Sequence, residues 1–172
     1  TPWDNVKMFE ELVANYAGSR YAVATDSCTN AIFLSLMYCR NTGRYTTAQP
    51  VTVPSRTYIS VPMQVKHAGY SVKFEDSNWS GLYTLCPTPV VDSAQRFTQN
   101  MYRHGTLQCI SFHSKKILSI GRGGMILTDD INARDWLVRA RYDGRKSIYY
   151  NDIRDDDEMM LGWHMYMIPE QA

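Results

Sequence analysis

The chain has 172 residues, of which 44% are hydrophobic and 20% are charged. That length suits one domain with a buried core, and the composition is ordinary for a globular protein. Because 18 basic residues nearly balance 17 acidic ones, a nucleic-acid-binding face is not expected. No apolar stretch approaches the roughly 18 residues of a membrane span, and no signal-peptide pattern opens the chain. These features predict a cytoplasmic protein with a single domain, residues 1–172.

The four cysteines, Cys28, Cys39, Cys86 and Cys109, lack the paired spacing of a metal site, and three of them lie in apolar stretches. We therefore expect reduced core thiols and no metal. The first residue is not methionine, and a helix that begins at Pro169 is cut off after one turn. A fragment, one half of a split enzyme, or a reduced version of a larger protein would each explain such ends.

Apolar periodicity and turn residues predict the elements in chain order. The expected helices cover residues 6–16, 31–39, 58–67 and 133–141, and the expected strands cover 21–25, 51–54, 70–74, 89–92, 107–112 and 124–128. Strands that alternate with helices predict a mostly parallel sheet covered on both faces, which is a three-layer α/β/α fold. In such folds, ligands bind at the carboxyl ends of the strands. The charged stretch 143–161 is expected to form an exposed loop.

Two side chains at predicted strand ends carry the most chemistry. Asp92 ends an apolar strand, and Lys116 lies between another strand and the glycine-rich turn 121–124. A lysine amine and a strand-end carboxylate suit pyridoxal phosphate, since the amine forms a Schiff base and the carboxylate keeps the pyridine nitrogen protonated. Alternatives remain for each residue: Asp92 could cap a following helix, and Lys116, like its neighbour Lys115, could be an ordinary surface lysine beside a tight turn.

Two weaker signals lie near other strand ends. Ser27 and Thr29 join a strand to a helix start, where free N–H groups and the helix dipole favour an anion, although simple capping explains them as well. Tyr58 follows a second strand and could stack on a flat ring or pack at the rim of the sheet. A nicotinamide-binding domain is excluded, because no Gly-x-Gly-x-x-Gly opens a helix after the first strand.

In their order along the chain, these motifs resemble the DegT-type sugar aminotransferase family of fold-type I pyridoxal-phosphate enzymes, over nearly the whole chain. The segment 27–31 resembles the family's phosphate-binding turn, which implies that Thr29 and Asn30 bind the cofactor. The segment 53–58 is similar to its Val-Pro-Ser-x-Thr segment, which implies that Tyr58 stacks on the cofactor ring. The resemblance also implies that this fold is the large domain of such an enzyme.

Two further segments carry the resemblance. The segment 92–95 resembles the Asp-x-Ala-Gln motif, which implies that Asp92 pairs with the pyridinium and that Gln95 approaches the phenolic oxygen. The segment 111–116 resembles the Ser-Phe-x-x-x-Lys motif, which implies that Ser111 binds the phosphate and Lys116 forms the Schiff base. The spacing to the preceding serine and the following glycine turn selects Lys116 over Lys115.

The resemblance implies an aminotransferase that moves an amino group from an amino acid, glutamate in the family pattern, to a nucleotide-linked keto sugar. Lys116 would then act as general acid and base. Relatives that dehydrate sugars have histidine in place of this lysine, so Lys116 points away from that branch. The resemblance also implies a homodimer with a shared active site, in which His164 and Tyr166 could serve the other subunit.

The chain departs from the family pattern at several places. Arg122 stands where the family usually has an acidic residue, and the stretch 96–106 is shorter than usual. His164 stands where the family has a residue that reaches the neighbouring subunit's cofactor. The usual C-terminal small domain is absent, so a second chain could supply it. These departures keep an alternative open, a non-catalytic or partner-dependent module that is a split or degenerate homologue.

Overall fold

The structure of the protein is a computed structural model, and it describes residues 1–146 and 159–172. The helices are α1 (Trp3–Ala17), α2 (Cys28–Asn41), α3 (Ser60–His67) and α4 (Ile131–Ala140), followed by a 3-10 turn at Pro169–Gln171. The strands are β1 (Tyr21–Thr25), β2 (Val51–Pro54), β3 (Val72–Glu75), β4 (Tyr83–Thr84), β5 (Val90–Asp92), β6 (Leu107–Ser111) and β7 (Gly124–Thr128). Every predicted helix and strand is confirmed with small shifts at its ends, and among the described elements only the short β4 was not predicted.

The α/β class is confirmed, but the main sheet is mixed rather than mostly parallel. Its strand order is β1-β7-β6-β5-β4, and β2 and β3 form a separate parallel pair. Within the main sheet β5 and β6 are parallel, whereas the other three pairings are antiparallel. The chain passes from β6 to β7, and from β4 to β5, without a crossover helix in the described connections. Such short connections return the chain beside the strand it has just left, which gives antiparallel neighbours.

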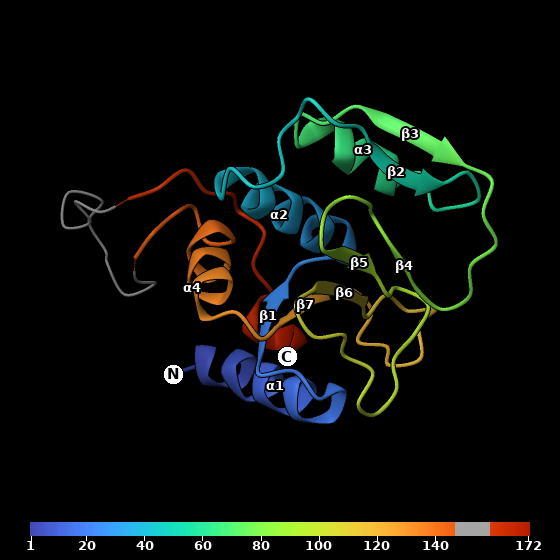
Figure 1. Cartoon of the computed structure of the whole chain (residues 1–172). Coiled ribbons are helices and arrows are strands. Elements are labelled where there is room, and N and C mark those ends of the chain that lie inside the picture. Colours follow the sequence, from blue (N-terminus) through green and yellow to red (C-terminus); the bar gives the residue numbers. More distant parts are fainter. Residues whose placement is uncertain (147–158) are drawn as a thin grey trace.

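The predicted three layers are confirmed, with helix α1 on one face of the main sheet and α2 and α4 on the other (Figure 1). Because side chains alternate along a strand, β1 contributes to two separate cores. Ala22 and Ala24 pack with α1, while Val23 packs with α2 and α4. Strands β6 and β7 alternate in the same way, so the sheet separates two hydrophobic clusters.

A buried ion pair ties the layers together near the chain's first helix. Arg141, just after α4, donates to the Glu10 carboxylate of α1 and, at 2.6 Å, to the backbone oxygen of Ala24 in β1. The same Glu10 carboxylate accepts from the Ala24 N–H at 2.7 Å. Both charged side chains are largely buried, so each satisfies the other where water is scarce. This network fixes α1 and α4 to β1.

The cysteines follow the prediction: all four are free, and Cys28, Cys39 and Cys109 are buried while Cys86 is exposed. Among the described helices, none has the length and apolar character needed to cross a bilayer. The predicted exposed loop 143–161 falls mainly in 147–158, outside the described residues.

Candidate functional site

The strand ends singled out in the sequence meet at one edge of the main sheet. Register pairs Asp92 of β5 with Cys109 of β6, and Ser111 of β6 with Gly124 of β7. Gly124 in turn pairs with Thr25, the last residue of β1. The carboxyl ends of β1, β5 and β6 therefore lie side by side, where ligands of α/β sheets bind.

Asp92 is buried at this edge, with 7% of its surface exposed. The Tyr83 hydroxyl donates to its Oδ2 at 2.7 Å, and the Ala94 N–H donates to its Oδ1 at 2.8 Å. Burial raises the pKa of the Asp92 carboxyl, while these two donors and the charge of Lys116 act in the opposite direction. No helix lies between β5 and β6, so Asp92 caps a turn through the Ala94 N–H rather than the helix of the alternative reading.

Lys116 lies on the loop after β6, near enough for its charge to lower the pKa of Asp92. It lines a cavity of about 50 Å³ together with Gln95, Ser111 and Lys115. Lys116 is half-buried whereas Lys115 is exposed, and Lys116 is the lysine whose charge lowers the pKa of Asp92. The structure thus brings three of the predicted site residues, Gln95, Ser111 and Lys116, into one cavity and distinguishes the two neighbouring lysines.

The turn between β1 and α2 is built as a helix cap. Ser27 Oγ accepts from the Asn30 N–H at 3.2 Å, so the capping interpretation of Ser27 is correct. The Asn30 side-chain amide donates to Asp26 at 2.8 Å, and the Thr29 hydroxyl lies 3.0 Å from that of Ser60 in α3. Thr29 and Asn30, both predicted to bind the cofactor, therefore already have partners in the protein.

Gly124 brings the start of β7 against this turn. A Cβ atom at this position would lie 2.4 Å from the backbone nitrogen of Cys28 and 2.4 Å from the backbone carbon of Ser27. Contacts that short do not occur, so only glycine allows the two backbones to approach this closely. One glycine of the predicted glycine-rich turn therefore serves to pack the turn against the sheet edge.

Arg122 pairs with an acidic residue across the same edge. Its guanidinium donates to the Asp26 carboxylate at 3.2 Å and to the Asp26 backbone oxygen at 3.3 Å. The positive charge that departs from the family pattern is thus matched by a negative charge 96 positions earlier in the chain. The departure leaves this edge with a neutral pair instead of an unmatched cation.

Tyr58 is not brought into the cavity that Lys116 lines. Its side chain is 73% exposed, just before α3. Its neighbour Thr57, however, contacts the Tyr83 hydroxyl, which donates to Asp92. The Tyr58 segment is therefore linked to the buried carboxylate through Tyr83. Thr57 lies in the Val-Pro-Ser-x-Thr segment, but that motif gave it no role. The sequence offered no signal for Tyr83, because it lies in no motif and β4 is too short to show a period.

His164 and Tyr166 make contacts within their own chain. His164 Nδ1 lies 3.0 Å from the Asp143 carboxylate, and the His164 ring lies 4.6 Å from that of Tyr166. The ring of Tyr166 also packs against Trp3 at 5.4 Å. Both residues lie in the C-terminal segment, whose Met165 backbone oxygen accepts from the Asp26 N–H at 3.0 Å.

A lysine, a buried aspartate and a serine at the carboxyl edge of an α/β/α sheet are groups that could hold pyridoxal phosphate. The family model described as the DegT/DnrJ/EryC1/StrS aminotransferase family matches residues 1–91 and 92–171. The chain belongs to this family, and the cofactor of the family is pyridoxal 5'-phosphate. The predicted family and fold class are thereby confirmed.

Solved structures of the same fold include AtS13 from Actinomadura melliaura, with TM-score 0.81, 16% identity, and coverage of 97% of this chain and 57% of that one. The sugar aminotransferase CalS13 from Micromonospora echinospora gives TM-score 0.79 with the same identity and coverage. NtdA from Bacillus subtilis, with bound cofactor PMP, gives TM-score 0.78 and 16% identity, with 97% and 46% covered. The chain thus spans about half the length of these structures. A search of curated protein sequences finds no match.

Proposed function

We propose that this chain holds pyridoxal phosphate at the edge formed by Asp92, Ser111 and Lys116 and acts as an aminotransferase. The observation that carries the proposal is the position of Lys116. It shares a cavity with Gln95 and Ser111, and its charge acts on the buried Asp92 carboxyl. A primary amine beside a buried carboxylate is the pair of groups that this cofactor requires.

The environment of Asp92 fits the cofactor's pyridinium. Its two oxygens accept from neutral donors only, the Tyr83 hydroxyl and the Ala94 N–H. Among the described residues, no ion pair engages this carboxylate directly. A carboxylate has about four acceptor positions, so Asp92 can accept from a further, cationic donor. A ring N–H⁺ would supply that donor and offset the burial that raises the pKa of Asp92.

Each predicted site residue has a role toward the bound cofactor, which itself supplies an electron sink for charge that develops on the substrate carbon. Asp92 keeps the ring nitrogen protonated, and Lys116 Nζ holds and transfers the proton that moves during the exchange. Other roles follow the family motifs: phosphate binding for Thr29, Asn30 and Ser111, ring stacking for Tyr58, and contact with the phenolic oxygen for Gln95.

The proposed reaction takes an amino group from an amino acid, glutamate in the family pattern, and delivers it to a nucleotide-linked keto sugar. Membership of an aminotransferase family supports the reaction type, and the description of CalS13 as a sugar aminotransferase supports the sugar acceptor. We further propose a homodimer with a shared active site, located in the cytoplasm, where the four free cysteines would stay reduced.

A specific observation favours the alternative of a partner-dependent module. Tyr58, proposed to stack on the cofactor, is 73% exposed, and the adjacent Ile59 is 66% exposed. Exposed apolar side chains beside a binding site often mark a surface that another chain covers. A second copy or a separate chain that covers this segment would bury these two side chains and could complete the site.

Visible absorption of the purified chain with added pyridoxal phosphate tests the proposal. We expect the yellow band of the lysine-bound cofactor in the wild type and in Lys115→Ala, and its loss in Lys116→Ala. Glutamate should bleach the band, because the amino group passes to the cofactor. A band that glutamate leaves unchanged would contradict the aminotransferase reaction but retain cofactor binding. No band in the wild type would contradict binding by the isolated chain and favour the partner-dependent alternative.

A further inference from the structure

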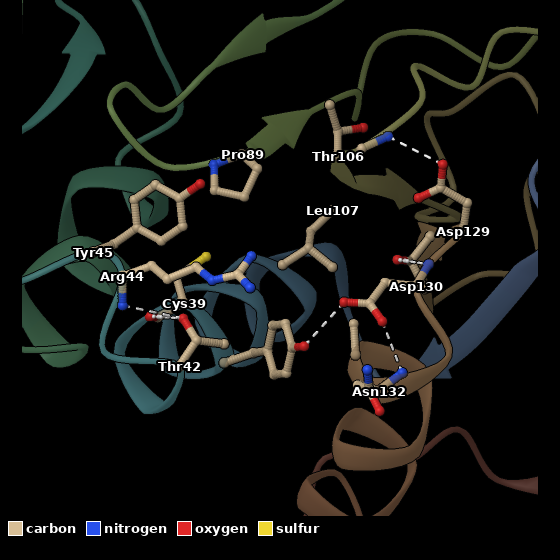
Figure 2. A pocket seen from close by; sticks show the side chains of 14 residues that line it. Cys39, Thr42, Arg44, Tyr45, Pro89, Thr106, Leu107, Asp129, Asp130 and Asn132 are labelled. Carbon is tan, nitrogen blue, oxygen red and sulfur yellow. Dashed lines mark hydrogen bonds between the residues drawn. The ribbon is translucent and has the colours of Figure 1, made fainter.

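A second cavity lies at the opposite edge of the sheet from Asp92. Its volume is about 380 Å³, and it opens between the end of α2, the starts of β5 and β6, and the start of α4 (Figure 2). Its lining includes Pro89, just before β5, and Leu107, the first residue of β6; Asp92 and Ser111 end these two strands. The cavity is therefore separated from the proposed cofactor edge by the length of the strands.

One wall of this cavity carries a positive charge. Arg44, on the loop after α2, extends its guanidinium toward the interior of the cavity, on the side of α2 and Tyr45 (Figure 2). Among the described residues, no hydrogen bond or ion pair engages this guanidinium. Its charge does act on Tyr38, whose pKa is nevertheless raised to about 12 by burial and by Asp130. Arg44 thus presents several unused N–H donors to the cavity.

The facing wall carries a negative charge. Asp130 Oδ2 accepts from the Tyr38 hydroxyl at 3.1 Å, and Asp130 Oδ1 accepts from the Asn132 N–H at 2.8 Å as the N-cap of α4. Each oxygen retains one acceptor position. Its neighbour Asp129 has three partners, the Tyr102 hydroxyl, the Gly105 N–H and His104 Nδ1 at 3.3 Å, whereas Asp130 has two. Asp130 is therefore the carboxylate with capacity left for a ligand.

We infer that this cavity binds an α-amino acid, with the carboxylate of the ligand on Arg44 and its ammonium group on Asp130. Figure 2 shows the two side chains on opposite walls, and they form no ion pair with each other within the described residues. A zwitterion satisfies both charges at once. A polyanion such as a nucleotide would face the two carboxylates of Asp129 and Asp130, and a simple cation would leave Arg44 unpaired. The volume suits a small ligand.

The experiment is a titration of the cofactor-free chain with L-alanine, followed by two-dimensional NMR of the backbone amides. Saturable shifts are expected around Thr42 and Asp129, on the two walls of the cavity. Acetate and methylammonium, which carry only one of the two charges each, should bind at least about tenfold more weakly. Asp130→Asn and Arg44→Gln should each weaken L-alanine binding about tenfold or more. Asparagine caps a helix as well as aspartate does, so Asp130→Asn keeps α4 in place.

Lys116→Ala provides the matched control, because it alters the proposed cofactor edge and leaves the cavity unchanged. Unchanged L-alanine affinity in Lys116→Ala supports the inference. The inference is overturned if no saturable shift occurs, if the shifts gather around Lys116 instead, or if neither Asp130→Asn nor Arg44→Gln weakens binding. It does not depend on the proposed cofactor, so failure here leaves the aminotransferase proposal standing.

Discussion

Replacement of Tyr83 by phenylalanine tests how Asp92 is kept ionised at its buried position. The Tyr83 hydroxyl is 2.7 Å from Asp92 Oδ2, and both residues are more than nine-tenths buried. A hydrogen bond to an ionised group in such a place contributes about 1.5–3 kcal/mol, so Tyr83→Phe should lower the free energy of unfolding at pH 7 by that amount. The ring is retained, and with it the packing against Trp79 at 4.8 Å.

The decrease in the free energy of unfolding caused by Tyr83→Phe should be larger at neutral pH than at acid pH. The hydrogen bond from Tyr83 lowers the pKa of Asp92, so its removal raises that pKa further. Once Asp92 is protonated the bond joins two neutral groups and contributes less, about 0.5–1.5 kcal/mol. The difference between wild type and Tyr83→Phe should therefore grow as pH rises through the titration of Asp92. Urea unfolding followed by circular dichroism between acid and neutral pH measures it, and a titration with pyridoxal phosphate should show weaker binding by the variant.

Tyr102→Phe is the matched control. The Tyr102 hydroxyl also donates to a carboxylate, that of Asp129 at 2.9 Å, but at the opposite edge of the sheet. This variant should lose stability without any change in cofactor affinity. A destabilisation of Tyr83→Phe that stays constant across the acid range would refute the reasoning, because the bond would then not depend on the charge of Asp92.

Three further changes follow from the same edge. Asp92→Asn should abolish cofactor binding. Because the fold raises the pKa of Asp92 above 3.8, the free energy of unfolding of the wild type falls as pH rises from that value. Urea unfolding of Asp92→Asn should not show this decline with pH. Gly124→Ala should lower the free energy of unfolding by about 1–3 kcal/mol, since its Cβ would lie 2.4 Å from the Cys28 backbone nitrogen. A decrease below about 0.5 kcal/mol in urea unfolding would show that the two backbones separate easily. Arg122→Gln should change the free energy of unfolding by less than about 1 kcal/mol, because the Arg122 side chain is 67% exposed. A larger decrease that added salt does not reduce would contradict the view that Arg122 and Asp26 form an ordinary surface ion pair.

The parts of the fold with a clear period could be predicted from sequence. The α1 and α2 helices and the β1, β6 and β7 strands have long apolar patterns, and their residues lie where those patterns indicated. The shared edge of Asp92 and Ser111 could also be predicted, because both residues follow buried strands. Sheet direction could not, since it depends on whether a connection crosses over or turns back, and the turn after Ser111 contains no residue that signals the choice.

The contacts that complete the candidate site were beyond sequence reasoning for a different reason. Tyr83 reaches Asp92 from a two-residue strand, and Arg122 reaches Asp26 across 96 positions. Such pairs arise from tertiary packing, and a single sequence contains no pattern that links their members. The sequence shows that Arg122 departs from the family pattern, but only the folded structure shows that Asp26 is its acidic partner.

The position of β7 affects the order in which the protein can assemble during synthesis. Strand β7 lies between β1 and β6, although it is the last of the seven described strands to emerge. Until residue 128 has left the ribosome, β1 has no hydrogen-bonded neighbour in the main sheet, and its turn toward α2 cannot meet Gly124. Pairings of such long sequence separation form late and slowly. A nascent chain stalled before β7 would therefore present two unjoined sheet edges, and chaperones would be expected to bind it at that stage.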